Sequence, residues 1–292
     1  MTFSEGGGFE GGRVKRRSGG AVAAGGGGLI GVIALAIYLF TGQDVSPLLG
    51  GAAPDGGGGQ ESSLVEYCTV EQANENPDCR LEVTIQALDT YWAEELASAG
   101  GSFQAPEAAV FEGSVSTACG AASSATGPFY CPADQSIYVD LGFFRTLQTQ
   151  FGAQGGPLAE MYVYAHEYGH HVQNLTGVFQ RADRSGGGAE SDSVRVELQA
   201  DCYAGMWAGA ATQTLRPGTD VPYLQPITAE ELAQALDAAA AVGDDHIQQQ
   251  SGGGVDSDTW THGSSEQRQR WFTIGYEQGS LEACDTFAAQ TL

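Results

Sequence analysis

The sequence predicts an α+β fold, mainly helical with a small antiparallel sheet, preceded by one transmembrane helix. Three observations support this prediction. A long uncharged stretch follows a basic N-terminus, short β-prone runs lie between turn residues, and several longer segments repeat apolar residues every three or four positions. The chain has 292 residues, of which 43 are glycines gathered in runs. This composition excludes a coiled coil and a uniformly packed helical bundle.

A membrane anchor is predicted near the N-terminus. Residues 19–40 form a stretch of 22 uncharged residues, enough to cross a hydrocarbon core of about 30 Å as a helix. Four basic residues lie at positions 13 and 15–17, and the next Lys or Arg is Arg80. By the positive-inside rule, residues 1–18 are a cytoplasmic tail of a single-pass cell-membrane protein, and the body is extracytoplasmic. A cleaved signal peptide is the alternative, because the strongly apolar part is short.

Cysteine usage agrees with an oxidising compartment. All six cysteines follow the predicted anchor, and two pairs are close enough in sequence to close short loops. Free or zinc-binding thiols are the alternative, but no C-x-x-C pair occurs. The expected disulfides are Cys68–Cys79, Cys119–Cys131 and Cys202–Cys284.

The chain is strongly acidic. It contains 36 acidic and 12 basic side chains, which gives a formal net charge of −24. Nucleic acids and anionic lipid surfaces repel such a polyanion. We therefore expect no nucleic-acid partner.

The predicted body follows a flexible linker over residues 41–63, which are rich in Gly, Pro and Ser. The folded domain is expected over residues 64–292. Apolar periodicity and capping boxes predict helices over residues 81–99, 142–150, 158–175, 194–215, 228–241 and 264–278. Short β-prone runs between turn residues predict strands over 110–115, 129–131 and 136–139.

The chemistry is concentrated in a helical segment that contains three of the five histidines. His166, Glu167 and His170 form the motif H-E-x-x-H. Residues four positions apart share a helix face, so both imidazoles can bind one Zn²⁺. Glu167 would then lie beside the metal as a general base toward a zinc-activated water, and pass the proton to the leaving amine. Gly169 is unfavourable inside a helix unless close packing requires it.

The next predicted helix supplies a candidate third ligand. Glu197 lies 27 residues beyond His170, and Asp201 follows it by one helical turn. Glu197 can bind the metal, while Asp201 can accept a hydrogen bond from the distal nitrogen of a ligand histidine. A solvated acidic helix face is the alternative. This order of motifs resembles that of the gluzincin metallopeptidases.

The resemblance extends along most of residues 65–290. Residues 117–144, the two motif helices, residues 261–272 and residues 283–287 together resemble the bacterial membrane-anchored neutral zinc metallopeptidases, a gluzincin-like zincin family. The basic N-terminus and single predicted span fit that family as well. The resemblance implies a zincin-like domain that uses zinc to hydrolyse peptides or proteins.

Two further features bear on catalysis. In zincins an edge strand above the active-site helix pairs with the extended substrate, and the hairpin over residues 129–140 is the candidate. An ordinary disulfide-linked structural hairpin is an equally good interpretation. His262, just before the last predicted helix, could stabilise the oxyanion of the tetrahedral intermediate, or make a structural hydrogen bond instead.

The two other histidines are assigned structural roles. His171 is expected to pack or cap rather than bind metal. His246 could join Asp256 and Asp258 in a calcium site, but an ordinary acidic loop is the preferred interpretation.

These observations predict a membrane-tethered zinc metalloendopeptidase with His166, His170 and Glu197 as metal ligands and Glu167 as general base. Two alternatives stay open. One is a non-catalytic envelope protein with a structural zinc, which a fourth protein ligand such as His171 would favour. The other is a zinc hydrolase that acts on cell-wall cross-links.

Overall fold

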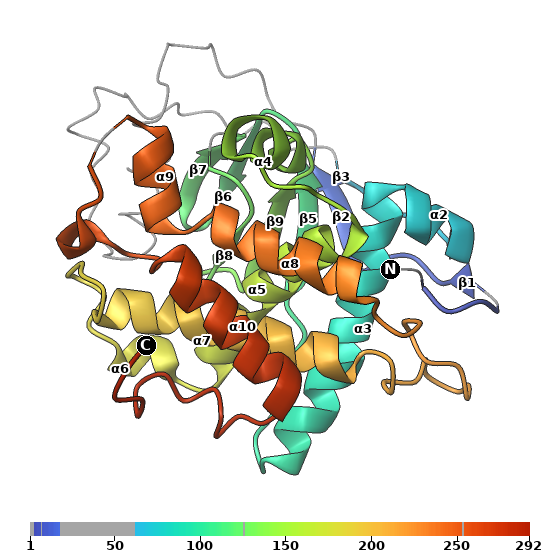
Figure 1. The fold of residues 1–292 in the computed structure, drawn as a ribbon. Coiled ribbons are helices and arrows are strands. Elements are labelled where there is room, and N and C mark those ends of the chain that lie inside the picture. The colour runs from blue at the N-terminus through green and yellow to red at the C-terminus, as the bar shows by residue number, and fades with distance from the viewer. Residues whose placement is uncertain (1–2, 7, 18–61, 125, 253) are drawn as a thin grey trace.

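The structure is a computed structural model that describes residues 3–6, 8–17, 62–124, 126–252 and 254–292. A layer of strands packs against a group of helices (Figure 1). Helix α5 (Pro157–Leu175) lies between them, because it contacts strands β8 (Phe129–Cys131) and β9 (Ser136–Asp140) as well as helices α7 (Asp192–Ala210) and α8 (Ala229–Ala241). The predicted α+β class is confirmed.

The remaining elements surround this centre. The other helices are α2 (Val70–Glu75), α3 (Pro77–Ser98), α4 (Phe143–Phe151), α6 (Val178–Arg181), α9 (Asp244–Gln250) and α10 (Ser265–Gln278). The other strands are β1 (Gly8–Phe9), β2 (Val14–Arg17), β3 (Ser62–Leu64), β4 (Cys68–Thr69), β5 (Glu107–Phe111), β6 (Ser114–Thr117) and β7 (Gly120–Ser123).

The main sheet is mixed, whereas the sequence predicted an antiparallel one. Its strand order is β3-β2-β5-β9-β8, and β5 runs parallel to both β2 and β9. Only the outer pairs, β2 with β3 and β8 with β9, are antiparallel. The reason is that the chain between β5 and β9 first forms the separate β6–β7 hairpin and then β8, so β9 returns beside β5 in the same direction.

The N-terminal segment belongs to this sheet. The sequence predicted a separate tail over residues 1–18, but β2 lies between β3 and β5. Val14 is fully buried, and the backbone N–H groups of Arg13 and Val14 donate to the two carboxylate oxygens of buried Glu82 at 3.0 and 2.7 Å. The predicted span over residues 19–40 lies outside the described residues. Within the described ranges, no helix combines the length and apolar character needed to cross a membrane.

Local signals set the helix ends where side chains bind free N–H groups. The predicted capping boxes begin α8 and α10, with Thr228 and Ser264 as the caps. Helix α3 begins four residues before its predicted start, because Asn76 accepts hydrogen bonds from two N–H groups and Pro77 suits the first helical position.

All three predicted disulfides are present. They fasten strands and helices to segments that are distant or nearby in sequence. The pairs are Cys68–Cys79, Cys119–Cys131 and Cys202–Cys284.

Helices α7 and α10 cross at very short range through two glycines. A Cβ on Gly275 would lie 1.9 Å from the carbonyl oxygen of Cys202, and a Cβ on Gly205 would lie 2.0 Å from that of Phe272. Since backbone atoms cannot move aside as a flexible side chain can, only glycine fits at this crossing.

We therefore expect Gly275→Ala to destabilise the fold, by about 1–3 kcal/mol or more, because the added methyl overpacks the crossing. Gly186→Ala is the matched control, since its Cβ would have no neighbour within 4 Å. Thermal unfolding followed by circular dichroism measures both, and equal midpoints for the two variants would contradict the close crossing.

Candidate metal centre

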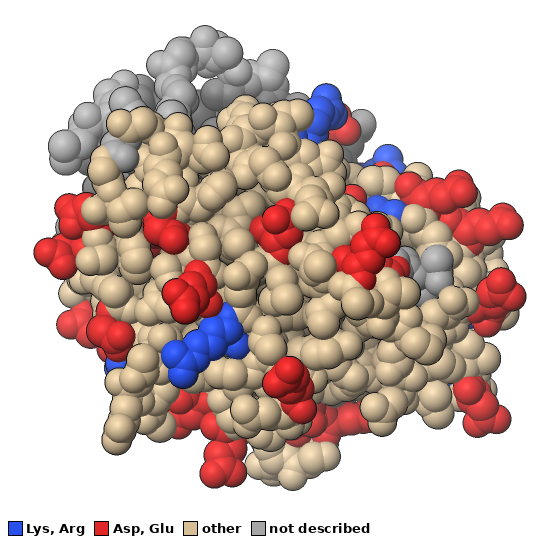
Figure 2. Space-filling model, viewed as in Figure 1, with Lys and Arg blue, Asp and Glu red and all other residues tan. Residues whose placement is uncertain are grey.

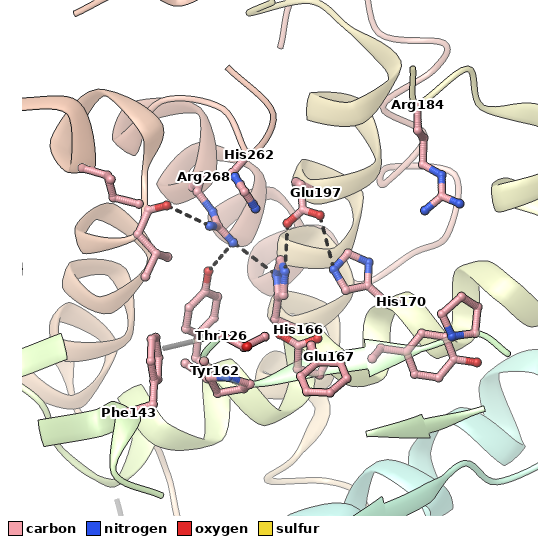
Figure 3. A pocket seen from close by; sticks show the side chains of 18 of the residues that line it. Thr126, Phe143, Tyr162, His166, Glu167, His170, Arg184, Glu197, His262 and Arg268 are labelled. Atoms are coloured by element: carbon pink, nitrogen blue, oxygen red, sulfur yellow. Dashed lines mark hydrogen bonds and ion pairs between the residues drawn. The ribbon is translucent and has the colours of Figure 1, made fainter. Parts of the chain in front are cut away.

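Helix α5 carries the H-E-x-x-H motif in its buried central part. His166 and His170 lie one turn apart, and each is 6% exposed. Their ring centroids are 4.7 Å apart. Both Nε2 atoms face the same carboxylate, that of Glu197 on α7 (Figure 3). The structure thus brings together the three residues that the sequence singled out as ligands.

The distances within this group fit a metal site. His166 Nε2 is 3.2 Å from Glu197 Oε2, and His170 Nε2 is 3.4 Å from Glu197 Oε1. Two ligand atoms that bind one tetrahedral zinc ion at about 2.0–2.1 Å are about 3.3 Å apart. Within the described ranges, this is the one group of three or more His, Cys, Asp or Glu side chains whose ligand atoms lie close enough to share an ion.

The state of the Glu197 carboxylate supports the same conclusion. Glu197 is 1% exposed, and its Oε1 accepts no hydrogen bond from the described residues. A buried carboxylate oxygen without a hydrogen bond is costly unless it is paired or binds a metal. Burial alone would raise the pKa of Glu197, but His170 and His166 lower it below the ordinary value. The residues present therefore fit Zn²⁺, for which two imidazoles and one carboxylate are a common catalytic ligand set.

Gly169 explains how α7 comes close enough to place this carboxylate. A Cβ on Gly169 would lie 3.1 Å from the Cα and the carbonyl oxygen of Ala200. Such contacts are tighter than ordinary side chains make, so any larger residue would push α7 away from α5. The glycine noted in the motif helix is therefore a packing requirement.

Asp201 orients the first histidine. It lies one turn after Glu197, and its Oδ1 is 2.8 Å from His166 Nδ1. An Nδ1–H that donates to Asp201 leaves Nε2 as the atom that can bind metal. Tyr162 donates its hydroxyl to the same oxygen at 2.6 Å. Burial lowers the pKa of His166, but Asp201 outweighs it and raises that pKa to about 10.

Arg268 balances the charge of Asp201, and the sequence analysis gave it no role. Its Nε and Nη2 donate to the two carboxylate oxygens of Asp201 at 2.8 and 2.9 Å. Burial alone would raise the pKa of Asp201, but Arg268 and His166 lower it. Arg268 stands on α10, far from the motif in sequence, so no local pattern could have revealed the pair.

The second histidine is held by a chain of amides. Gln173 Oε1 is 2.9 Å from His170 Nδ1, and Gln173 Nε2 donates to the carbonyl of Val196 at 2.7 Å and to Gln199 Oε1 at 3.1 Å. Gln199 in turn donates to the carbonyl oxygen of Cys284 at 3.0 Å. Burial lowers the pKa of His170 to about 4, which keeps the imidazole in the neutral form that binds metal.

Glu167 lies beside the ligands without belonging to them. It is 8% exposed and lines the cavity at the metal centre. Its carboxylate accepts a hydrogen bond from the backbone N–H of Tyr130 on the edge strand β8. Burial raises the pKa of Glu167 to about 7. A carboxylate with such a pKa can take up and release a proton near neutral pH.

His262 reaches the same cavity from the segment before α10. Its Nδ1 is 3.2 Å from Asp244 Oδ1. Asp244 Oδ2 also accepts the backbone N–H groups of Thr261, His262 and Gly263, at 2.7, 2.6 and 3.0 Å. Burial lowers the pKa of His262, but Asp244 outweighs it and raises the pKa above the ordinary value. The sequence indicated His262 but not its partner Asp244.

The other two histidines have structural partners, as the sequence analysis preferred. His171 Nδ1 is 3.0 Å from the hydroxyl of Tyr130, and its Nε2 is 2.6 Å from the carbonyl of Gln104. His246 Nε2 is 2.8 Å from the carbonyl of Phe151. Within the described ranges, His246 forms no ligand group with the acidic residues of its loop.

The cavity over this centre has a volume of about 210 Å³. Its walls come from α4, α5, α6, α7, α9, α10, strand β8 and the segments between these elements. Figure 3 shows the labelled side chains around it. The lining residues are Thr126, Gly127, Pro128, Phe129, Tyr130, Pro132, Phe143, Tyr162, Val163, His166, Glu167, His170, Phe179, Arg184, Glu197, Val242, Ile247, His262 and Arg268.

We expect Asp201→Asn to weaken zinc binding about 10–100-fold, because the amide no longer holds His166 in the ligand orientation. Competition with a chromogenic chelator measures the affinity. The matched control is Asp220→Asn, an exposed position. Equal zinc affinity in both variants would contradict the orienting role of Asp201.

Comparison with known sequences places the chain in a family. The family described as "Putative neutral zinc metallopeptidase" matches residues 3–287. Uncharacterized proteins of Mycobacterium tuberculosis (Rv2575) and Mycobacterium bovis are each 51% identical over 229 residues, 78% of this chain and 77% of theirs. The uncharacterized protein YpfJ of Escherichia coli K12 is 36% identical over 268 residues, 89% of this chain and 86% of its own. No solved structure matches. The chain belongs to the neutral zinc metallopeptidase family, as its motifs indicated.

Proposed function

We propose that this protein is a zinc-dependent endopeptidase. The observation that carries the proposal is the convergence of His166, His170 and Glu197 in a buried group, with Glu167 beside it in the same cavity. Zinc, when bound there, would act as a Lewis acid toward the scissile carbonyl and make water more acidic.

Glu167 is the general base of the proposed reaction. Its pKa of about 7 lets it remove a proton from the attacking water and give that proton to the leaving amine. The hydrogen bond from the Tyr130 N–H holds the carboxylate at the cavity wall. During this reaction, Asp201 keeps the imidazole of His166 in place, and Gln173 keeps that of His170.

His262 is the proposed electrostatic partner of the reacting carbonyl. It lines the cavity, and Asp244 holds its Nδ1 side. The imidazole can then donate a hydrogen bond to the carbonyl oxygen as negative charge develops on it. This is the functional interpretation that the sequence analysis left open.

Strand β8 is the proposed docking edge for the substrate. It ends the main sheet in the described part of the chain, and it lines the cavity through Phe129 and Tyr130. Although the side chains of β8 are buried, an extended peptide could add to the backbone of this terminal strand. The disulfide at Cys131 also fastens this strand, so docking and a structural role are compatible.

The arrangement favours catalysis over a purely structural zinc. A structural site requires a fourth protein ligand in place of water. His171, the candidate named for that role, instead contacts Tyr130 and Gln104. The three disulfides further support the proposal that the body folds in an extracytoplasmic, oxidising compartment.

The decisive experiment is digestion of a peptide library by the purified full chain. We expect a chelator to abolish cleavage and added zinc to restore it. Among the described residues, His166, His170 and Glu197 are the one group that could hold the ion. Bound zinc with no cleavage of any peptide would contradict the proposal. Cleavage of cell-wall cross-links alone would favour the hydrolase alternative.

Glu167→Gln is expected to keep zinc and to lower kcat about 10²–10⁴-fold, because the amide cannot accept the proton. Metal analysis and peptide kinetics measure the two effects separately. Glu94→Gln, an exposed position on α3, is the control. Undiminished turnover in Glu167→Gln would remove Glu167 from its role.

His262→Ala is expected to lower kcat about 10²–10³-fold with little change in zinc affinity, because it removes a donor to the developing charge and no metal ligand. His246→Ala is the matched control, since His246 lies away from the cavity lining. If both variants kept wild-type kcat, His262 would be purely structural.

A further inference from the structure

The cavity has two chemically different ends. Figure 3 shows Phe143 on one side of the metal ligands and Arg184 on the other. The Arg184 guanidinium lies 4.5 Å above the ring of Phe179. Helices α4, α8 and α9 contact one another at this side. The apolar lining residues from α4, α5, α9 and the residue after α8 are Phe143, Val163, Ile247 and Val242. We call these four residues the apolar end.

The apolar end adjoins the proposed reacting atoms. Val163 lies four residues before Glu167 on α5, so both side chains stand on one helix face. Two arginines line the cavity: Arg184 lies on the other side of the metal ligands, and Arg268 pairs with Asp201 at 2.8 and 2.9 Å. The charge of Arg268 is therefore compensated within the protein and is not offered to a substrate carboxylate.

We propose that the apolar end selects substrates with a large apolar side chain next to the scissile bond; this inference rests on the proposed function. An apolar side chain gains by leaving water there. An Asp or Glu side chain would lose its hydration and find no compensating cation. Since one methylene in such a pocket changes kcat/KM by about tenfold or more, Leu or Phe should exceed Ala by at least that factor.

The test is the residue profile around the cut sites in a peptide library digested by the zinc-loaded full chain. Enrichment of Leu, Ile, Met or Phe at one position flanking the bond is the expected result. Cleavage without such enrichment overturns this inference and leaves the endopeptidase proposal intact. Absence of any zinc-dependent cleavage overturns both.

Variants locate the selection in the apolar end. Ile247→Lys is expected to reduce cleavage next to apolar residues at least tenfold and to favour Asp or Glu there. Ile274→Lys is the control, because Ile274 is also a half-buried helical isoleucine but lies outside this cavity. Phe143→Ala, which enlarges the end, should shift the preference toward Trp. An unchanged profile in both Ile247→Lys and Phe143→Ala overturns the assignment.

An independent observation concerns the N-terminal segment. In β2 and its neighbours, Arg17 is the Cα partner of Ser62 on β3 and of Phe111 on β5. The two residues that bound the segment 18–61 are thus paired across adjacent strands of one sheet.

Side chains fasten the N-terminal segment to the body, and two of these contacts involve arginines. The Arg13 guanidinium donates to Asp89 at 2.7 and 3.3 Å, and Asp89 Oδ1 also accepts the hydroxyl of Tyr168, on the motif helix, at 2.7 Å. Arg216 binds the carbonyl oxygens of Ser4 and Gly6.

Apolar burial adds to these contacts. The Arg216 guanidinium lies 4.4 Å above the ring of Phe9, which is 4% exposed. Phe3 and Val14 are fully buried. A segment with this burial behaves as part of the domain core and not as a separate tail.

We infer that residues 3–17 and 62–292 fold as one domain on the same side of any membrane. Strand pairing requires neighbouring strands about 4.8 Å apart, whereas a bilayer core is about 30 Å thick. A single crossing between Arg17 and Ser62 would put these partners on opposite sides. A cytoplasmic tail joined by one crossing to an extracytoplasmic body is incompatible with this pairing.

Two measurements test this inference on the full chain. Reporters of compartment fused before Met1 and after Leu292 should report the same side. In a chain with Arg16→Cys and Ser63→Cys, mild oxidation should give a disulfide between these Cα partners. The control pair is Arg16→Cys with Glu66→Cys, which the register does not bring together. Reporters in opposite compartments, or no disulfide in the first pair, would overturn it.

Discussion

The close approach of α5 and α7 is the constraint on which the site depends. At Gly169 the two helix backbones come so near that a single methyl would contact Ala200. This proximity lets one turn of α7 present Glu197 to both imidazoles, and the next turn present Asp201 to the far side of His166. A small increase in the separation would break every one of these contacts together, because both helices are rigid and buried.

The two buried carboxylates at this crossing, Asp201 and Glu197, are compensated in different ways. Asp201 is fully buried, and Arg268 compensates it through two hydrogen bonds, so a charged carboxylate can stay ionised behind His166. The Glu197 carboxylate has no arginine partner of this kind; its Oε1 lies 3.4 Å from His170 Nε2 and accepts no hydrogen bond from the described residues. Asp201 is therefore suited to orient a ligand histidine, and Glu197 is suited to be a ligand itself. On the molecular surface, acidic side chains are spread over the face shown in Figure 2, with few basic ones among them.

The sequence could predict whatever depends on local spacing. Residues four apart on a helix share a face in any fold, so His166 with His170, and Glu197 with Asp201, were recognisable as pairs. Capping boxes at Thr228 and Ser264 and short cysteine spacings are equally local, and the structure confirms them. The helix that carries the motif begins and ends within one residue of its expected range.

Contacts between segments that are distant in sequence could not be predicted from local spacing. Arg268, Gln173 and Asp244 carry no motif of their own, since their roles come from what the fold places opposite them. The basic run at β2 has the charge pattern of a membrane flank, yet it forms a strand between β3 and β5. The composition of this run shows its positive charge, but it does not show which strands it pairs with.

The amide chain behind His170 ties the metal centre to the far end of the polypeptide. It ends at the carbonyl of Cys284, which the disulfide to Cys202 fixes against α7. A chain that stopped before Cys284 would lose this last acceptor and the sulfur link together. Gln199 would then lack its acceptor, whereas Gln173 would keep the carbonyl oxygen of Val196 as a partner, so the end of the chain supports the ring of His170 only through this relay.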